Sequence, residues 1–215
     1  MSAQDVAKLR EITGVGILDC KKALSETNGD IDKAIVILRE KGIIVAAKKA
    51  GRIAAEGLVA SYIHMGGRIG VLVEMNCETD FVAKSDQFNE LIKDIAMQIA
   101  ASKPLYVNID EVTPEEIENE KEVLRNQAKN EGKKPELIEK MVEGRIKKFF
   151  SNICLMEQPF IRDSAKTVKD MINEATLKIG EKIVVRRFVR YEMGEGLEKR
   201  KDDFVEEINK QIKGE

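Results

Sequence analysis

The chain has 215 residues, of which 43% are hydrophobic, so it is long and apolar enough for one medium-sized domain or for a small domain beside a larger one. Charged residues make up 34% of the chain but nearly cancel, to a net charge of -2. That balance excludes the overall positive field that draws many proteins to nucleic acid, and it makes a folded protein the expected partner.

Three short amphipathic helices are predicted in residues 1–42, where apolar residues recur at helical spacing. The first ends at Thr13-Gly14-Val15-Gly16, and the second begins at Leu18 and ends before Asn28-Gly29. Asp30 caps the third helix, which is predicted to end at Gly42. Three helices of this length form a small domain.

Residues 43–56 are rich in Ala, Lys and Arg and are predicted to be a linker with helical tendency. A basic linker can contact RNA or an acidic partner, although a solvated connector is the simpler interpretation. The linker separates the first domain from a core predicted over 57–200. Apolar residues at helical spacing then predict a final helix over 201–215; they are Phe204, Val205, Ile208 and Ile212.

The alternating pattern of residues 58–75 predicts a β-hairpin, with a tight two-residue turn at Gly66-Gly67. That turn pairs four sets of residues on one apolar face: His64 with Ile69, Tyr62 with Val71, Ala60 with Val73, and Leu58 with Met75. The opposite face is mixed and carries Met65, Arg68, Ser61 and Glu74. His64 is the one histidine of the chain, so a hydrogen-bonded structural or interface role suits it better than metal ligation.

The segment 76–84 is predicted to be an exposed loop between this hairpin and a long helix. Phe81 is unusual in such a place, because an exposed aromatic ring costs hydration free energy unless a partner or a local pocket buries it. From the residues alone two interpretations stay open. Phe81 packs back onto the following helix, or it contacts a partner.

The second half of the chain alternates helices with short strands. Apolar residues from Phe88 to Ala100 predict a long helix that ends before Lys103-Pro104, followed by a β-like piece at 105–109. Thr113-Pro114 begins a projecting helical hairpin over 113–150. Its two antiparallel helices share a narrow apolar stripe of Ile117, Val123, Leu124, Ile138, Met141 and Val142.

A further helix is predicted over 164–175, and a strand over 182–193 is predicted to join the first hairpin as its third strand. The fold class is therefore α+β, with a small antiparallel sheet. The arginines of this strand allow an RNA-binding interpretation, but charges on an edge strand more often prevent aggregation.

Motifs for catalysis, nucleotide binding or metal binding are not found in the sequence, so a binding or regulatory protein is favoured over an enzyme. Cys20, Cys77 and Cys154 are too far apart for a zinc site, and their odd number argues against a disulfide scaffold. A Cys77-His64 thiol dyad is disfavoured, because the two residues would lie at opposite ends of the hairpin. With no signal pattern and no apolar run of roughly 20 residues, a reducing, cytoplasmic location away from membranes is expected.

Several stretches together resemble one known family. They are residues 9–24 with Asn28-Gly29-Asp30, then Asn76-Cys77-Glu78-Thr79-Asp80-Phe81-Val82-Ala83, and finally 141–145, 158–160 and 194–199. In this order, and over nearly the whole chain, they resemble bacterial translation elongation factor Ts. The resemblance implies a guanine-nucleotide exchange factor for elongation factor Tu that needs no cofactor or metal and binds neither nucleotide nor nucleic acid itself.

The resemblance also implies roles for particular residues. Residues 1–42 resemble a ubiquitin-associated domain, and three of them are expected to contact the partner's nucleotide-binding domain: Ile17, Leu18 and Lys21. The segment expected beside the partner's nucleotide comprises Thr79, Asp80, Phe81 and Val82. There Phe81 would enter an apolar cleft and Asp80 would perturb the magnesium side. His64 and Met65 match a region used for a second contact, and 113–150 corresponds to a protruding coiled coil.

One departure from the longer members of this family concerns the core. Those members carry two related sheet subdomains, whereas here the motif around Phe81 leads into a single helix and then to the helical hairpin. The chain thus resembles a short form, in which a homodimer can supply the missing surface. The competing function is an RNA- or ribosome-associated adaptor, which depends on Lys48-Lys49, Arg52 and Arg186-Arg187.

Overall fold

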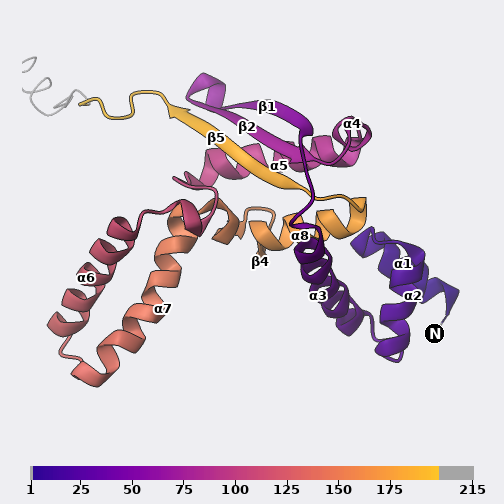
Figure 1. Cartoon of the computed structure of the whole chain (residues 1–215), viewed down its shortest axis with the longest axis horizontal. Helices are drawn as coiled ribbons and strands as arrows, with labels where there is room; N and C mark the ends of the chain where they lie inside the picture. Colours follow the sequence, from indigo (N-terminus) through magenta and orange to yellow (C-terminus); the bar gives the residue numbers. More distant parts are fainter. Residues whose placement is uncertain (1, 199–215) are drawn as a thin grey trace, which may run out of the picture.

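The computed structural model describes residues 2–198 and has a small sheet over a layer of helices, below which two helical arms extend in the same general direction (Figure 1). The predicted α+β class, with helices at the N-terminus and a small antiparallel sheet, is confirmed. The helix predicted over 201–215 lies outside the described residues. Among those that are described, no helix is both long and apolar enough to span a bilayer.

The sheet has three antiparallel strands, β1 (Glu56–His64), β2 (Ile69–Cys77) and β5 (Val184–Glu192), in the order β1-β2-β5. The predicted hairpin register is confirmed, since His64 lies opposite Ile69 and Leu58 opposite Met75. The turn is wider than the predicted two-residue Gly-Gly turn. It contains the 3-10 turn η1 (Met65–Gly67), in which Met65 joins both glycines at positive φ.

The main core lies between this sheet and α5 (Asp86–Ser102), which crosses beneath it (Figure 1). The predicted apolar face of α5 is confirmed, because all of its members are buried: Phe88, Leu91, Ile92, Ile95, Ala96, Ile99 and Ala100. They meet Val71, Val73 and Met75 on the inner face of the sheet. α8 (Val168–Ile179) adds Val168 and Ile172 from below.

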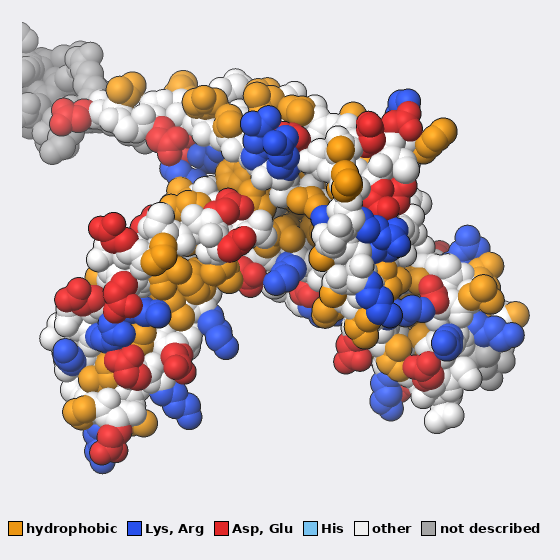
Figure 2. Space-filling view, in the orientation of Figure 1, with side chains coloured by type: hydrophobic (Ala, Val, Ile, Leu, Met, Phe, Trp, Pro, Cys, Tyr) orange, Lys and Arg blue, Asp and Glu red, His pale blue; other side chains and the backbone are white. Residues whose placement is uncertain are grey.

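The other face of the sheet carries exposed apolar side chains, and within residues 2–198 nothing covers them. We call this the outer sheet face; it comprises Val59, Ile63, Leu72, Val189 and Tyr191. In Figure 2, hydrophobic side chains lie along the sheet at the top of the view. An exposed patch of this kind often marks a contact surface.

The N-terminal arm consists of α1 (Ala3–Thr13), α2 (Ile17–Glu26) and α3 (Ile31–Lys49), around a small core that includes Leu9, Leu24 and Leu38. The prediction that the third helix ends at Gly42 was wrong, since α3 continues to Lys49 through part of the expected linker. Gly42 permits close packing instead: a Cβ there would lie 3.3 Å from the carbonyl oxygen of Asn173 in α8. The glycine therefore allows α3 to pack against the core.

The second arm is the predicted helical hairpin, formed by α6 (Pro114–Asn130) and α7 (Pro135–Ile153). Thr113 caps α6 in a reciprocal capping box with Glu116. The buried seam comprises Leu124, Ala128, Ile138, Val142 and Ile146. Val123, which was predicted on the seam, is exposed on the outside. The arm projects from the core with solvent on most sides (Figure 1).

Two further boundaries differ from the prediction. The expected β-like piece at 105–109 forms only an isolated bridge between Tyr106 and Cys154, and the turn η2 (Ile109–Glu111) follows. The helix expected over 164–175 begins only at Val168, because β4 (Asp163–Thr167) first pairs with β3 (Pro159–Phe160). The turn η3 (Leu155–Glu157) connects α7 to β3.

Gly57 is the glycine on which the hairpin depends most. Its φ is +148°, and a Cβ there would lie 2.1 Å from the carbonyl oxygen of Met75 in β2. We therefore expect Gly57→Ala to lower the free energy of unfolding by about 2–4 kcal/mol, measured by urea denaturation. Gly70→Ala is the matched control, since its Cβ would meet only Ile63 Cδ1 at 3.5 Å. Equal losses for both variants would contradict the expectation.

Candidate functional site

Residues 79–84, here called the α4 turn, follow directly on β2 at one end of the sheet. The segment was predicted to be a loop, but β2 continues to Cys77 and α4 (Asp80–Ala83) forms one helical turn. Thr79 caps that turn, and its hydroxyl accepts a hydrogen bond from the amide of Val82 at 3.4 Å. Threonine is a favoured residue at this position because its oxygen satisfies an amide that the helix leaves free.

Phe81 points into solvent from the α4 turn and is 83% exposed. Its neighbours lie on the inner side of the turn: Ala83 is buried, and Val82 is half-buried against the main core. This arrangement excludes the interpretation in which Phe81 packs back onto α5. An aromatic ring held out of the core by its own backbone is available for a partner.

Asp80 is half-exposed beside Phe81 and pairs with the end of the same turn. Its Oδ2 accepts a hydrogen bond from Nζ of Lys84 at 2.7 Å, which lowers the pKa of the Asp80 carboxyl and raises that of Lys84. Asp80 is therefore charged at neutral pH. Since both side chains are exposed to water, the pair is weak and either member can exchange its partner.

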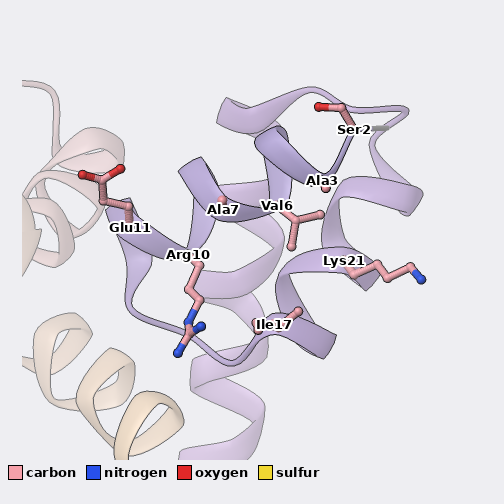
Figure 3. Close-up of a pocket in the computed structure, with 8 residues that line it drawn as sticks. All are labelled: Ser2, Ala3, Val6, Ala7, Arg10, Glu11, Ile17 and Lys21. Carbon is pink, nitrogen blue, oxygen red and sulfur yellow. The ribbon is translucent and has the colours of Figure 1, made fainter.

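The second group of predicted site residues lies on α2, in the N-terminal arm. Ile17 and Lys21 help to line a groove of about 720 Å³ between α1 and α2, here called the α1/α2 groove; its other lining residues are Ser2, Ala3, Val6, Ala7, Arg10 and Glu11. In Figure 3, Val6 of α1 lies across from Ile17 of α2. Leu18 lies beside the groove and is 82% exposed.

The contribution of α1 to this groove was missed from the sequence. The helical spacing places both Val6 and Arg10 on the first predicted helix but gives neither of them a role in binding. The missed signal is that both residues lie one helical turn apart on α1, so they present a single strip to α2. The structure thus joins Ile17 and Lys21 to residues of another helix.

The third group, His64 and Met65, lies at the hairpin tip. The Tyr62 hydroxyl and His64 Nδ1 are 3.0 Å apart, and the two rings are stacked, so His64 is hydrogen-bonded. Met65 is exposed beside it. The tip and the α4 turn are separated by the length of β2, roughly 25 Å for a strand of this length. The three groups therefore form separate surfaces, as a broad protein contact would use, and not one pocket.

Cys77 is fully buried next to the α4 turn, and its thiol donates a hydrogen bond to the carbonyl oxygen of Thr79 at 3.2 Å. Burial, followed by the nearby negative charge of Glu181, raises the pKa of the Cys77 thiol to about 11. His64 lies at the opposite end of the sheet. A protonated thiol without a base does not act as a nucleophile, so the thiol-enzyme interpretation has no support here.

The raised pKa predicts a pH dependence. Because the folded pKa lies above the ordinary value of 9.0, the thiol's contribution to stability is complete below pH 9 and is lost as the pH rises towards 11. We expect Cys77→Ala to make the melting temperature less dependent on pH in this range than it is in the original chain. Both proteins carry the same Lys and Tyr residues, so the difference between their slopes of melting temperature against pH reports Cys77 alone. Equal slopes for the two proteins would contradict the expectation.

The chain is similar to known proteins of one family. The model of the family described as "Elongation factor TS" matches residues 3–195. A protein named elongation factor Ts from Desulforamulus reducens is 67% identical over 213 residues, which are 99% of this chain and 98% of the relative. Relatives of the same name from Heliobacterium modesticaldum and Acetivibrio thermocellus are 63% and 60% identical; the first match covers 99% of both chains and the second covers both completely.

Proposed function

The chain belongs to the elongation factor Ts family, which acts in translation elongation, and from this premise we propose that it is a guanine-nucleotide exchange factor for elongation factor Tu. It binds the GDP-bound factor and promotes release of GDP, without covalent chemistry. The observation that carries the proposal is Phe81, which is 83% exposed on a turn whose other side is anchored in the core. The site of action is the cytoplasm, where elongation takes place.

Exchange follows from linkage between two binding reactions. A protein that binds best to the nucleotide-free state of its partner must lower the partner's affinity for nucleotide in the same proportion. A tenfold effect requires only about 1.4 kcal/mol of coupling. Burying the Phe81 ring in an apolar cleft of the partner contributes roughly 1.5–3 kcal/mol, which is sufficient for such an effect.

Asp80 has a separate, electrostatic role in this proposal. Its charged carboxylate is held by Lys84 in the free protein, and the pair is exposed enough to separate when a partner arrives. Beside the partner's nucleotide, a carboxylate disturbs the balance of charge around the magnesium ion and the phosphates. Thr79 and Val82 hold the turn, one as its cap and the other by packing on the core.

Docking uses the other two groups. Ile17, Leu18 and Lys21 contact the nucleotide-binding domain of elongation factor Tu, and the wide separation of α2 from the α4 turn suits a large partner. His64 and Met65 provide a second contact at the hairpin tip. The aromatic stacking of His64 on Tyr62 gives that tip a defined surface.

A second copy of the chain is the proposed occupant of the outer sheet face. This face exposes apolar side chains, with Leu72 on the central strand and Val189 and Tyr191 on β5, and it also carries the Glu74 carboxylate paired with Arg186 and Arg187. A homodimer formed through it would supply the surface that a second sheet subdomain supplies in longer family members. Light scattering on the isolated chain should give twice the mass of one chain, and a monomer at micromolar concentration would contradict the homodimer.

The exchange function is tested with a fluorescent GDP analogue bound to elongation factor Tu. Catalytic amounts of the chain should accelerate release of the analogue in the presence of excess GDP. The matched control is the heat-denatured chain at the same concentration. Release at the spontaneous rate with the native chain would refute the proposal.

The RNA-associated alternative has less support from the charged side chains. Arg186 and Arg187 both donate to the Glu74 carboxylate at 2.7 Å, and Arg52 pairs with Glu78. These cations are therefore already partly neutralised within the chain. A steep loss of RNA affinity with added salt, together with no binding to elongation factor Tu, would favour the alternative.

A further inference from the structure

Glu181 lies in the loop between α8 and β5 and holds the start of the α4 turn with both carboxylate oxygens. Its Oε2 accepts hydrogen bonds from the backbone amides of Glu78 and Thr79, each at 3.0 Å. Its Oε1 accepts one from the Thr79 hydroxyl at 2.7 Å. Hydrogen bonds to a carboxylate are stronger than those between neutral groups, so this is a specific anchor.

The anchor is reciprocal. Oε1 of Glu78 accepts a hydrogen bond from the backbone amide of Lys182 at 2.6 Å, and this bond is the main reason that the pKa of Glu78 is lowered. Arg52 adds a charged hydrogen bond to the same carboxylate at 3.1 Å. Two neighbouring segments, one before α4 and one before β5, thus each bind the other's backbone through a glutamate.

The same loop also binds the C-terminal end of α3. Nζ of Lys49 donates to the carbonyl oxygen of Gly180 at 2.6 Å, and Nζ of Lys182 donates to the carbonyl oxygens of Ala50 and Arg52 at 2.5 and 2.9 Å. The N-terminal arm and the α4 turn are therefore fixed to one common loop. This loop links the two surfaces that the proposed exchange reaction uses.

Apolar packing alone does not set the direction of the α4 turn. A single turn of helix is not stable by itself, and Phe81 and Asp80 contribute no buried contacts to it. Only Val82 and Ala83 reach the core, and they lie on the inner side. At the C-terminal end of the turn, the Ser85 hydroxyl donates to the carbonyl oxygen of Val82 at 2.7 Å. The hydrogen bonds to Glu181 hold the N-terminal end, so the two ends together fix the orientation of the turn about the inner contact.

We propose that Glu181 is a positioning residue for exchange, whose carboxylate fixes the direction in which the α4 turn presents Phe81 and Asp80. The inference rests on the proposed function, since it assigns a role within that reaction. A displaced turn would bury less of the Phe81 ring in the partner, and each 1.4 kcal/mol of binding free energy lost in this way corresponds to about a tenfold lower rate. Loss of the anchor should therefore reduce the maximal exchange rate more than it reduces binding through α2.

The test compares three substitutions of Glu181 in the full chain. Glu181→Ala removes all three bonds, and Glu181→Asp keeps the charge but is one methylene too short to reach. Both should lower the maximal rate of GDP-analogue release about tenfold or more. Glu181→Gln keeps an amide oxygen of the right reach and should restore most of the rate. The concentration of the chain that gives half the maximal release rate should change less than about twofold, because the substitutions do not alter docking through Leu18.

Hydrogen exchange gives a readout that does not depend on activity. The amides of Glu78 and Thr79 should exchange faster in Glu181→Ala and Glu181→Asp than in the original chain, while amides in α5 stay protected. Glu131→Ala is the matched control, since it removes a carboxylate that accepts two hydrogen bonds from Arg145 on the distant helical hairpin. That control should change neither the release rate nor these two amides.

Each outcome decides the inference. A maximal rate unchanged in Glu181→Ala, with fast exchange of both amides, would show that the anchor is structural only and overturn it. Should Glu181→Ala fail to fold, the other two variants decide, because the inference requires Glu181→Asp to be slower than Glu181→Gln. An original chain that leaves GDP release at the spontaneous rate would instead refute the proposed function, and with it this role.

Discussion

Replacing Phe81 with alanine should slow factor-dependent GDP release by about tenfold to a hundredfold, because the variant loses the roughly 1.5–3 kcal/mol that burial of the ring in the partner provides. The same substitution should leave the free energy of unfolding within about 0.5 kcal/mol of the original value, since the side chain is 83% exposed. Stopped-flow release of a fluorescent GDP analogue and urea denaturation measure the two quantities.

Leu105→Ala is the matched control for this variant. Leu105 is also a large, exposed apolar residue in a loop, but it lies after α5 at the far end of the core. Leu105→Ala should change neither the rate of GDP release nor the free energy of unfolding. A large loss of stability in Phe81→Ala would return the ring to the core, and an unchanged release rate would remove it from the exchange mechanism.

The sequence alone does not decide whether Phe81 packs on the following helix or contacts a partner. A local pattern shows which residues share one face of a helix, but it does not show which face of a short turn meets the core. Val82 and Ala83 pack on the core, so Phe81 lies on the outer side of the turn, and the hydrogen bonds to Glu181 hold the start of that turn. Sequence spacing within a four-residue helix is too short to show this. The partner role of the exposed ring comes from the family and stays a prediction.

The elements with strong periodicity were predictable. In the hairpin, one apolar face and the central glycines fixed the pairing of His64 with Ile69, and a slip of one residue would have placed the polar face in the core. In α5 the buried residues follow the helical period from Phe88 onwards, because the helix crosses a single sheet face. Burial on one side imposes the pattern that the sequence displays.

The errors occurred where one residue type has two physical uses. Gly42 was interpreted as a helix end, yet it allows α3 to approach the backbone of Asn173. Thr167 was placed inside a helix, but its hydroxyl caps α8 by accepting from the amide of Asp170. In both cases tertiary packing, which local spacing does not contain, decides between the uses.

The anchor at Glu181 was missed for a related reason. It joins residues 102 positions apart in the chain, and a glutamate in a loop has no distinguishing local pattern. The α1/α2 groove likewise requires two helices to be packed before Val6 and Ile17 face each other. Similarity to the family's motifs points to the exposed residues Phe81 and Leu18. The residues that hold them in place, such as Glu181, can be found only from the structure.

Replacing Leu18 with alanine should weaken binding to elongation factor Tu by up to about sixtyfold, while leaving the exchange rate at saturating concentrations of the chain unchanged. The substitution removes the branched end of a side chain that is 82% exposed in the free chain, and each buried carbon is worth about 0.8 kcal/mol in the complex. Since Leu18 lies on α2, which Figure 1 shows apart from the α4 turn, it is expected to contribute to docking and not to nucleotide release. Measuring the release rate at increasing concentrations of the chain separates weaker binding to elongation factor Tu from a lower maximal rate.

Val36→Ala is the matched control for Leu18→Ala, because Val36 is an exposed apolar residue on α3 of the same arm. It should change neither the half-saturating concentration nor the maximal rate. Both variants should melt within a few degrees of the original chain, as expected for exposed positions. A lower maximal rate in Leu18→Ala, with an unchanged half-saturating concentration, would show that α2 acts in release itself and would contradict the division of roles between the N-terminal arm and the α4 turn.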